Sequence, residues 1–235
     1  YQKDEVIRNL LGNRDITIVP MVNPDGAEYD IESGTYRSWR KNRTENKGSS
    51  CAGVDLNRNY GYRWGTGGSS KSPCSDTFMG AEAFSEPETR AIKGLVESRP
   101  NTKILLTFHT FSELILYPWG HTYDDITNTP HLTAYENMAR TMASWNGYRP
   151  QQSSELYITS GDTTDWSYGQ LGIFSFTFEL SPRDMWGGGG FYPGPDAVER
   201  TFQANIRPSL YLIDLADDPL RAAFRPETTL FYGRQ

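Results

Sequence analysis

The sequence predicts an α/β fold, with a mixed, mostly parallel, twisted sheet flanked by helices. Three observations support this prediction. Short apolar segments have the length and composition of strands, capped segments with apolar residues at helical spacing lie between them, and the chain shows no internal repeat.

Three segments are predicted to be strands. Residues 16–22 (ITIVPMV) are β-branched and almost continuously apolar, and they end at residues 23–26 (NPDG), a sequence typical of a turn. Residues 104–108 (ILLTF) have the same character and end on His109. Residues 174–180 (FSFTFEL) alternate with a period of two, which is typical of a strand with two different faces.

Three segments are predicted to be helices. Residues 85–88 (SEPE) have the form of a capping box with proline in the first turn. Residues 133–136 (TAYE) repeat the pattern, and the helix that they begin is expected to end at Gly147. The third helix is expected over about residues 197–216, kinked at Pro208, with these side chains facing inward: Val198, Phe202, Ile206, Leu210 and Ile213.

The composition limits the function. The chain has 235 residues and a formal net charge of −6, with both signs mixed along it. Because there is no basic field and no apolar run of about 20 residues, neither nucleic acid nor a membrane is expected as a partner. Residues 1–218 are predicted to form one globular unit, and the weakly patterned residues 219–235 a tail or linker. The chain opens on Tyr1 without a signal peptide, so we expect a processed product or part of a longer protein.

Cys51 and Cys74 flank a Gly/Ser-rich segment without regular periodicity. A disulfide between them is expected to restrain this segment and to stabilise the fold by about 3 kcal/mol through loop entropy. Such a bond would place the protein in an oxidising compartment. The alternative is two unrelated buried thiols.

Glu179 is the first candidate for catalysis. The alternation of residues 174–180 places Glu179 on the face opposite the phenylalanines, beside an apolar strand. Partial desolvation would raise the pKa of its carboxyl group and suit it to act as a general base. The alternative is a glutamate that pairs with an arginine at the end of the sheet.

His109 and two arginine-rich strings are further candidates. A single histidine at the end of a strand is also typical of a hydrogen-bonded core residue, and neither His121 nor His131 has zinc-ligand spacing with His109. The strings RSWRKNR (37–43) and DLNRN (55–59) are either a solvated face or a site that binds a carboxylate, for which arginine is well suited.

Taken together, these segments resemble the zinc metallocarboxypeptidases, of which carboxypeptidases A and B are familiar members, and the bacterial carboxypeptidase T group more closely. The matching motifs follow one another along the chain: NPDG at 23–26, RSWRKNR at 37–43, the Cys51 and Cys74 pair, DLNRN at 55–59, HTFSEL at 109–114, Tyr157 before GDTTDW at 161–166, and FTFEL at 176–180. The resemblance implies the zinc-carboxypeptidase type of α/β fold, with its N-terminal strands and ligand motif absent from this chain.

The resemblance also implies a role for each matching residue. Glu179 matches the general base, and Arg40 the arginine that stabilises the oxyanion. The residues that match the substrate-binding positions are Asn57 and Arg58 for the C-terminal carboxylate, Tyr157 as a closing tyrosine, and Arg37, Thr164 and Thr177.

His109 matches one of three protein ligands of a single catalytic Zn²⁺. The resemblance implies that the other two ligands belong to a His-x-x-Glu motif upstream of Tyr1, after a strand that lies beside residues 16–22 in the sheet. One histidine cannot form a catalytic zinc site, which has about three protein ligands. We therefore expect the chain alone to be inactive and an upstream segment of the same protein to complete both the sheet and the metal site.

The resemblance implies a secreted, extracellular zinc exopeptidase that releases single C-terminal amino acids by Glu-assisted attack of zinc-bound water. Thr164, with Asp162 nearby, implies a preference for hydrophobic C-terminal residues and some tolerance of lysine or arginine. Two alternatives remain: a non-catalytic relative that binds peptide C-termini, and a related zinc amidohydrolase. Retention of both Glu179 and Arg40 favours the peptidase over the binding protein, because binding alone needs neither.

Overall fold

The fold is known from a computed structural model that describes residues 4–224. Its elements, in chain order, are α1 (Glu5–Gly12), α2 (Pro24–Ile31), the 3-10 helix η1 (Leu56–Arg58), α3 (Pro87–Glu97), β1 (Ile104–Thr110), β2 (Leu114–Tyr117), α4 (Thr129–Asn146), β3 (Arg149–Gln152), the 3-10 helix η2 (Ser153–Glu155), α5 (Thr163–Leu171), β4 (Phe174–Leu180), α6 (Met185–Gly188), α7 (Asp196–Leu215) and α8 (Arg221–Phe224).

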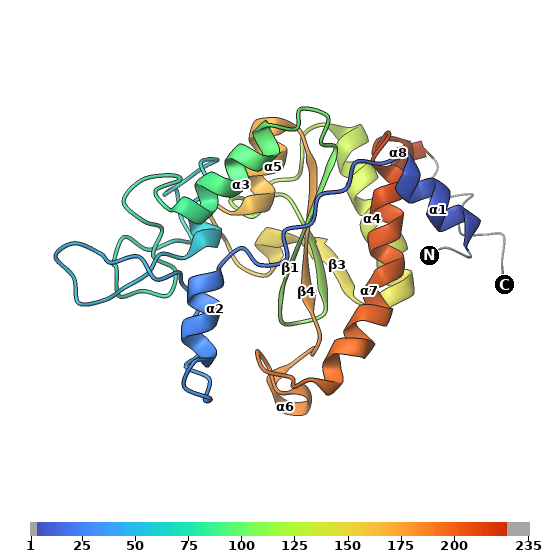
Figure 1. The fold of residues 1–235 in the computed structure, drawn as a ribbon. Helices are drawn as coiled ribbons and strands as arrows, with labels where there is room; N and C mark the ends of the chain where they lie inside the picture. Colours follow the sequence, from blue (N-terminus) through green and yellow to red (C-terminus); the bar gives the residue numbers. More distant parts are fainter. Residues whose placement is uncertain (1–3, 225–235) are drawn as a thin grey trace.

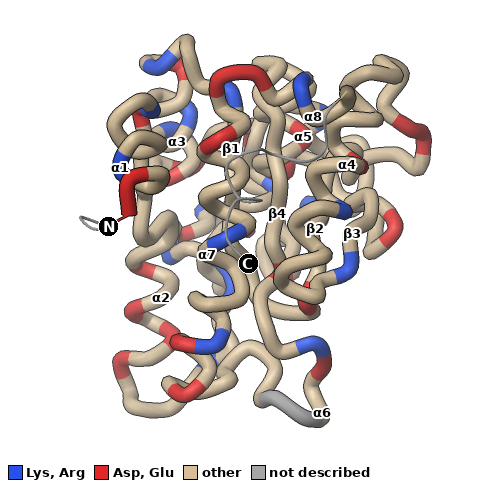
Figure 2. Tube along the Cα trace, turned by 90° about the vertical axis from the view of Figure 1, so that its right-hand side faces the viewer, with Lys and Arg blue, Asp and Glu red and all other residues tan. Residues whose placement is uncertain are grey.

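The four strands form one mixed sheet in the order β1-β4-β2-β3, which Figure 2 shows side by side. β1 pairs with β4 in parallel, β2 pairs with β3 in parallel, and only β2 and β4 are antiparallel. The predicted mixed, mostly parallel sheet is therefore confirmed. Figure 2 also shows acidic and basic residues interspersed over the surface, without a field of one sign.

Helices cover both faces of the sheet. Figure 1 shows α4, α7 and α8 on one side and α3 and α5 on the other. The main core lies between the sheet and α4, α7 and α8, where Tyr135, Met138, Phe176, Phe178 and Tyr211 are all fully buried. These large apolar side chains supply most of the hydrophobic stabilisation on this side of the sheet.

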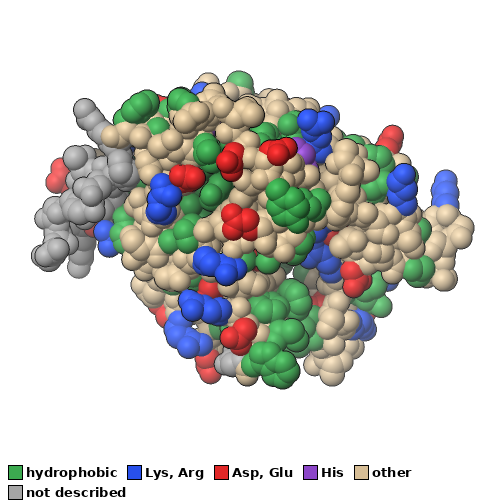
Figure 3. All heavy atoms as spheres, turned by 180° about the vertical axis from the view of Figure 1, so that it is seen from behind, with side chains coloured by type: hydrophobic (Ala, Val, Ile, Leu, Met, Phe, Trp, Pro, Cys, Tyr) green, Lys and Arg blue, Asp and Glu red, His purple; other side chains and the backbone are tan. Residues whose placement is uncertain are grey.

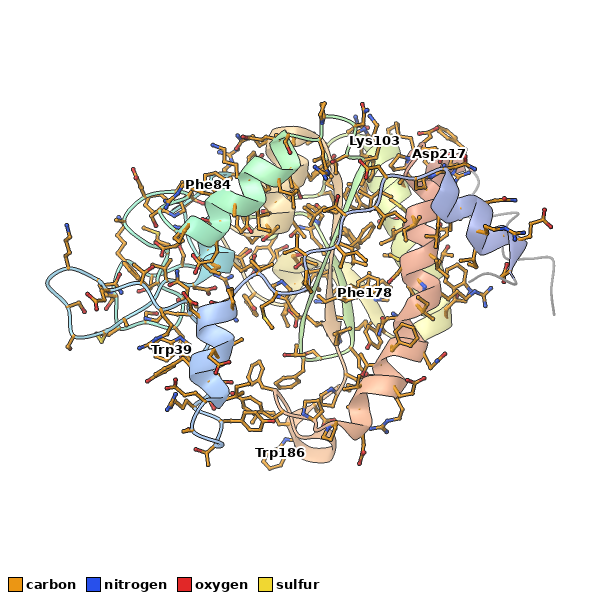
Figure 4. All side chains as sticks on the ribbon, viewed as in Figure 1. Trp39, Phe84, Lys103, Phe178, Trp186 and Asp217 are labelled. Atoms are coloured by element: carbon orange, nitrogen blue, oxygen red, sulfur yellow. A yellow bond between two sulfur atoms is a disulfide. The ribbon has the colours of Figure 1, made fainter. Side chains whose placement is uncertain are left out.

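The strand β4 and its two faces are as predicted. Its bounds are Phe174–Leu180, and its phenylalanines belong to the main core. Ser175 on the other face donates a hydrogen bond to the Thr164 carbonyl of α5, 2.8 Å away. Figure 4 shows Phe178 near the middle of the molecule, between the layers of helices.

The predicted helices exist, but two of them begin differently. α3 follows Glu86, which makes no side-chain capping bond, and the hydroxyl of Ser85 donates to the Glu86 carboxylate rather than capping the helix. α4 begins at Thr129, four residues before Thr133, because Asn128 accepts a hydrogen bond from the His131 amide and caps it. The prediction that α4 ends at Gly147 is confirmed, since this glycine has a left-handed φ of 74°.

The predictions for residues 16–26 are wrong. Residues 23–26 do not form a turn but start α2, with Asn23 as the cap and Pro24 in the first turn, an arrangement typical of a helix N-terminus. Residues 16–22 form no strand, and Ile18 and Met21 are 80% and 55% exposed. Figure 1 shows this stretch as an extended trace between α1 and α2. An apolar sequence forms a buried strand only beside another strand, and within residues 4–224 these residues pair with none.

The inward face predicted for α7 is also partly wrong. The helix spans Asp196–Leu215 and contains Pro208, but Val198 and Phe202 are 67% and 53% exposed and Ile206 is exposed too. Tyr211, Leu212 and Leu215, in the second half of the helix, are buried instead. In the first half, Ala197 and Asn205 are the buried residues, so a different side of the helix faces the described residues there.

The disulfide Cys51–Cys74 is present, as expected. Within the expected tail from residue 219, α8 packs on α4 and Ala222 is fully buried. Residues 225–235 of that tail lie outside the described residues. None of the described helices has the length and apolar character required to cross a membrane.

Candidate active site

A cavity of about 230 Å³ lies at the end of β1 and β4. All the predicted site residues except Arg37 line it: Arg40, Asn57, Arg58, His109, Tyr157, Thr164, Thr177 and Glu179. Figure 3 shows the surface hollowed between hydrophobic and basic side chains. Residues from four distant parts of the sequence thus meet at one place.

The sheet places His109 beside Glu179. The two residues are register partners in the parallel pair β1 and β4, so their side chains point to the same face. Only 8% of Glu179 is exposed. Burial raises the pKa of the Glu179 carboxyl from 4.5 to about 7, although the positive charges of Arg40 and Arg58 oppose this increase. A carboxyl group with this pKa is suited to accept and release a proton near neutral pH.

His109 is neutral at this site. Burial, together with the nearby charge of Arg40, lowers the pKa of its imidazole to about 4. Its Nε2 atom lies 3.1 Å from the hydroxyl of Thr107, two residues earlier on the same strand. A neutral imidazole can act as a metal ligand.

Arg40 is held by Asp55, a residue that the sequence analysis did not single out. The Arg40 Nε–H donates to Asp55 Oδ2 at 2.9 Å, and the side chain of Asp55 is almost completely buried. The other oxygen of Asp55 accepts a hydrogen bond from the Asn57 amide and caps η1. An aspartate directly before a short helix is a capping signal, and this could have identified Asp55 in the sequence.

Asn57 and Arg58 are brought to the cavity by η1. Arg58 is buried, and two of its nitrogens are occupied by the carbonyls of Gly68 (3.1 Å) and Asn57 (2.7 Å). Its guanidinium carbon lies 5.8 Å from the centre of the Tyr157 ring. Tyr157 is 49% exposed, so its ring forms the outer edge of the cavity.

Thr164 and Asp162 also line the cavity. The Asp162 carboxylate accepts hydrogen bonds from the hydroxyls of Thr159 (2.7 Å) and Thr164 (2.9 Å) and from the Asp165 amide (2.8 Å), which it caps at the start of α5. Leu116 and Leu156 add apolar surface to the same cavity. Neither α5 nor the Thr159 contact is predicted from the sequence, although Asp162 and Gly172 are typical residues before and after a helix.

Arg37 does not reach the cavity. It forms an ion pair with Glu32 at 2.7 Å, and its guanidinium carbon lies 4.3 Å from the centre of the Tyr29 ring. Its substrate-binding role stays a prediction from the resemblance.

The described residues do not fit a zinc site by themselves. Residues 4–224 contain no group of three or more His, Cys, Asp or Glu residues that could hold a metal ion. His109 is one suitable donor, whereas a catalytic zinc site has about three protein ligands. What these residues do provide is a proton acceptor beside hydrogen-bond donors for anionic oxygens.

The α/β fold thus brings a buried carboxyl group, two arginines and an asparagine together in one cavity. Residues 1–207 match the family model of the zinc carboxypeptidases. The chain belongs to the zinc carboxypeptidase family.

Known relatives support this assignment. The chain is 44% identical to a zinc carboxypeptidase of Saccharothrix mutabilis subsp. capreolus, over 87% of this chain and 48% of that protein. It is 39% identical to a zinc carboxypeptidase of Simulium vittatum, over 79% of this chain and 62% of that protein, and 37% identical to carboxypeptidase A1 of Rattus norvegicus, over 80% and 45%. The chain thus spans about half the length of the curated relatives that it matches.

Solved structures show the same fold. The crystal structure of thrombin activatable fibrinolysis inhibitor superimposes with a TM-score of 0.76 at 30% identity, over 96% of this chain and 55% of that one. Carboxypeptidase A from Helicoverpa armigera gives a TM-score of 0.63 at 29% identity, over 89% of this chain and 50% of that one.

Proposed function

We propose that the protein containing this chain is an exopeptidase that releases single C-terminal amino acids from peptides. The observation that supports this proposal most is the meeting of Glu179 with Arg40, Asn57 and Arg58 in one cavity. The proton acceptor then lies beside donors for two anionic groups, the carboxylate of the substrate and the oxyanion that develops at the scissile carbonyl.

Each residue has a distinct task in this reaction. Asn57 and Arg58 bind the free C-terminal carboxylate and so limit cleavage to the last residue. Glu179 takes a proton from the attacking water and delivers it to the leaving amine. Arg40, fixed by Asp55, stabilises the oxyanion, and the exposed Tyr157 closes over the bound residue. Because the described residues do not hold a zinc ion alone, we assign no step to the metal.

The specificity follows from the floor of the cavity. We propose a preference for hydrophobic C-terminal side chains, supported by Leu116 and Leu156, with some tolerance of lysine or arginine through the charge of Asp162. The three donors to the Asp162 carboxylate among residues 4–224 are neutral, the hydroxyls of Thr159 and Thr164 and the Asp165 backbone N–H. Competition between peptides that end in Phe, Leu, Arg and Glu tests this, and a preference for Glu would contradict it.

We further propose that an upstream segment of the same protein adds a strand to the outer edge of β1 and supplies the remaining zinc ligands. Exposed apolar side chains support the proposal: residues 16–22 and Phe108 are exposed, and so are Val198 and Phe202 in the first half of α7. The chain alone is then expected to be inactive. Full activity and a full equivalent of zinc in the isolated 235-residue chain would contradict this.

We propose a secreted, extracellular protein, because the disulfide Cys51–Cys74 is typical of oxidising compartments. Reaction of the native protein with a thiol reagent, before and after reduction, tests whether this bond is present when the protein is isolated from its source.

Glu179→Gln is the decisive test of the exopeptidase. In a form of the protein that includes the proposed upstream segment, assayed with zinc, kcat for an N-acylated dipeptide is expected to fall by about 10²- to 10⁴-fold, because the amide cannot accept the proton. Glu136→Gln, on the exposed surface of α4, is the matched control. If the Glu179 variant keeps its activity, the proposed mechanism is wrong; if the unchanged protein binds peptides but never cleaves them, the non-catalytic binding function is correct.

A further inference from the structure

The amide of Asn57 is fixed from one side only. Its Oδ1 atom accepts two hydrogen bonds from Thr163, one from the backbone N–H and one from the side-chain hydroxyl, each at 3.0 Å. An asparagine amide has an oxygen and an NH₂ group of almost the same shape, so either could face a ligand. Two donors on one side require the oxygen there, and the NH₂ group therefore faces the cavity.

Thr163 is fixed by the start of α5. It is the first residue of that helix, and the preceding Asp162 caps the helix by accepting a hydrogen bond from the Asp165 backbone N–H at 2.8 Å. Both donors to Asn57 therefore come from one residue whose backbone is held in place.

We infer that Thr163 is a positioning residue that makes the site discriminate a free C-terminal carboxylate from a C-terminal amide. Thr163 does not line the cavity, so it acts through Asn57 rather than on the ligand. Two nitrogens of Arg58 donate to backbone carbonyls, and the side-chain oxygen of Asn57 accepts from Thr163. The groups that Asn57 and Arg58 still offer to a ligand are therefore N–H donors. A carboxylate has only acceptors, whereas an amide brings its own donors.

This inference rests on the proposed function, because it assumes that Asn57 and Arg58 bind the carboxylate. It also predicts what happens without the Thr163 hydroxyl. When the Thr163 hydroxyl is lost, only the Thr163 backbone N–H still donates to Asn57. The side-chain amide of Asn57 then rotates by 180° more often. A turned amide presents an oxygen, which repels a carboxylate and accepts a bond from an amide ligand.

The test measures the dissociation constants of N-acetyl-L-phenylalanine and N-acetyl-L-phenylalaninamide on the 235-residue chain by NMR titration. In Thr163→Val, which keeps the shape of the side chain, the preference for the acid is expected to fall by about fivefold, the effect of one hydrogen bond. Thr163→Ser restores the hydroxyl and is expected to restore the preference.

Ser167→Ala is the matched control. Ser167 lies in the same helix and donates to the Thr164 carbonyl, without contact to Asn57, so its loss is expected to leave the preference unchanged. If the unchanged chain does not prefer the acid, the proposed function fails. If it does, but Thr163→Val keeps the full preference or Thr163→Ser loses as much as Thr163→Val, then only the positioning role of Thr163 is wrong.

Discussion

The rings of Phe178 and Phe108 contact each other edge to face, with their centres 5.7 Å apart, yet the surroundings of the two side chains differ. Phe178 on β4 is fully buried, whereas Phe108 on β1 is 51% exposed. The same contrast extends to whole regions. β4 has a paired strand on each side and packed helices around it, while the outer edge of β1 faces apolar residues that remain in water. The hydrophobic pattern is equally strong on both sides, so pattern alone does not determine burial; a partner must be present as well.

Phe178→Ala is expected to have the largest effect on stability. Truncation of a large side chain that is fully buried typically costs about 3 to 5 kcal/mol, through lost transfer energy and the cavity that remains. Urea denaturation of the 235-residue chain measures this change in the free energy of unfolding. A loss below about 1 kcal/mol would mean that the β4 side is as open as the β1 side, and the comparison would fail.

This contrast also explains how much of the fold the sequence could predict. Residues 174–180 were predicted with the correct bounds and the correct faces, because their alternation reflects a surface that the described residues cover. Residues 16–22 were predicted as a buried strand and form none. Their apolar pattern is that of a buried strand, but no strand among the described residues pairs with them.

The site was predictable to the extent that single residues carry the chemistry. Glu179, Arg40 and Asn57 were assigned from motifs, and the structure brings them to one cavity. The supporting residues differ: a capping signal could have identified Asp55, whereas no local signal marks Thr163. A threonine has many local uses in a sequence, and the contact between Thr163 and Asn57 joins residues that are 106 positions apart.

Arg40→Gln is expected to change the titration of Glu179. Burial raises the pKa of Glu179 to about 7, and Arg40 lowers it, so removal of this charge raises the pKa further. Between pH 4.5 and 7 the folded chain holds a proton that the unfolded chain releases, so the free energy of unfolding falls as the pH rises through this window. In Arg40→Gln, the pH range over which the free energy of unfolding falls is expected to extend to higher pH. Carboxyl ¹³C NMR measures the titration, with Arg40→Lys as the control that keeps the charge; an unchanged or lowered pKa in Arg40→Gln would contradict the prediction.

Phe108→Ser is expected to have the smallest effect in the 235-residue chain, about 1 kcal/mol or less, because half of this side chain is already in water. In a longer form with a strand against β1, the same substitution would empty a covered site and cost about 3 kcal/mol or more. The difference between the two forms therefore measures how much of Phe108 the added segment buries. Equal losses in both forms would mean that the edge of β1 stays open, and the apolar residues of 16–22 and α7 would then need a different partner.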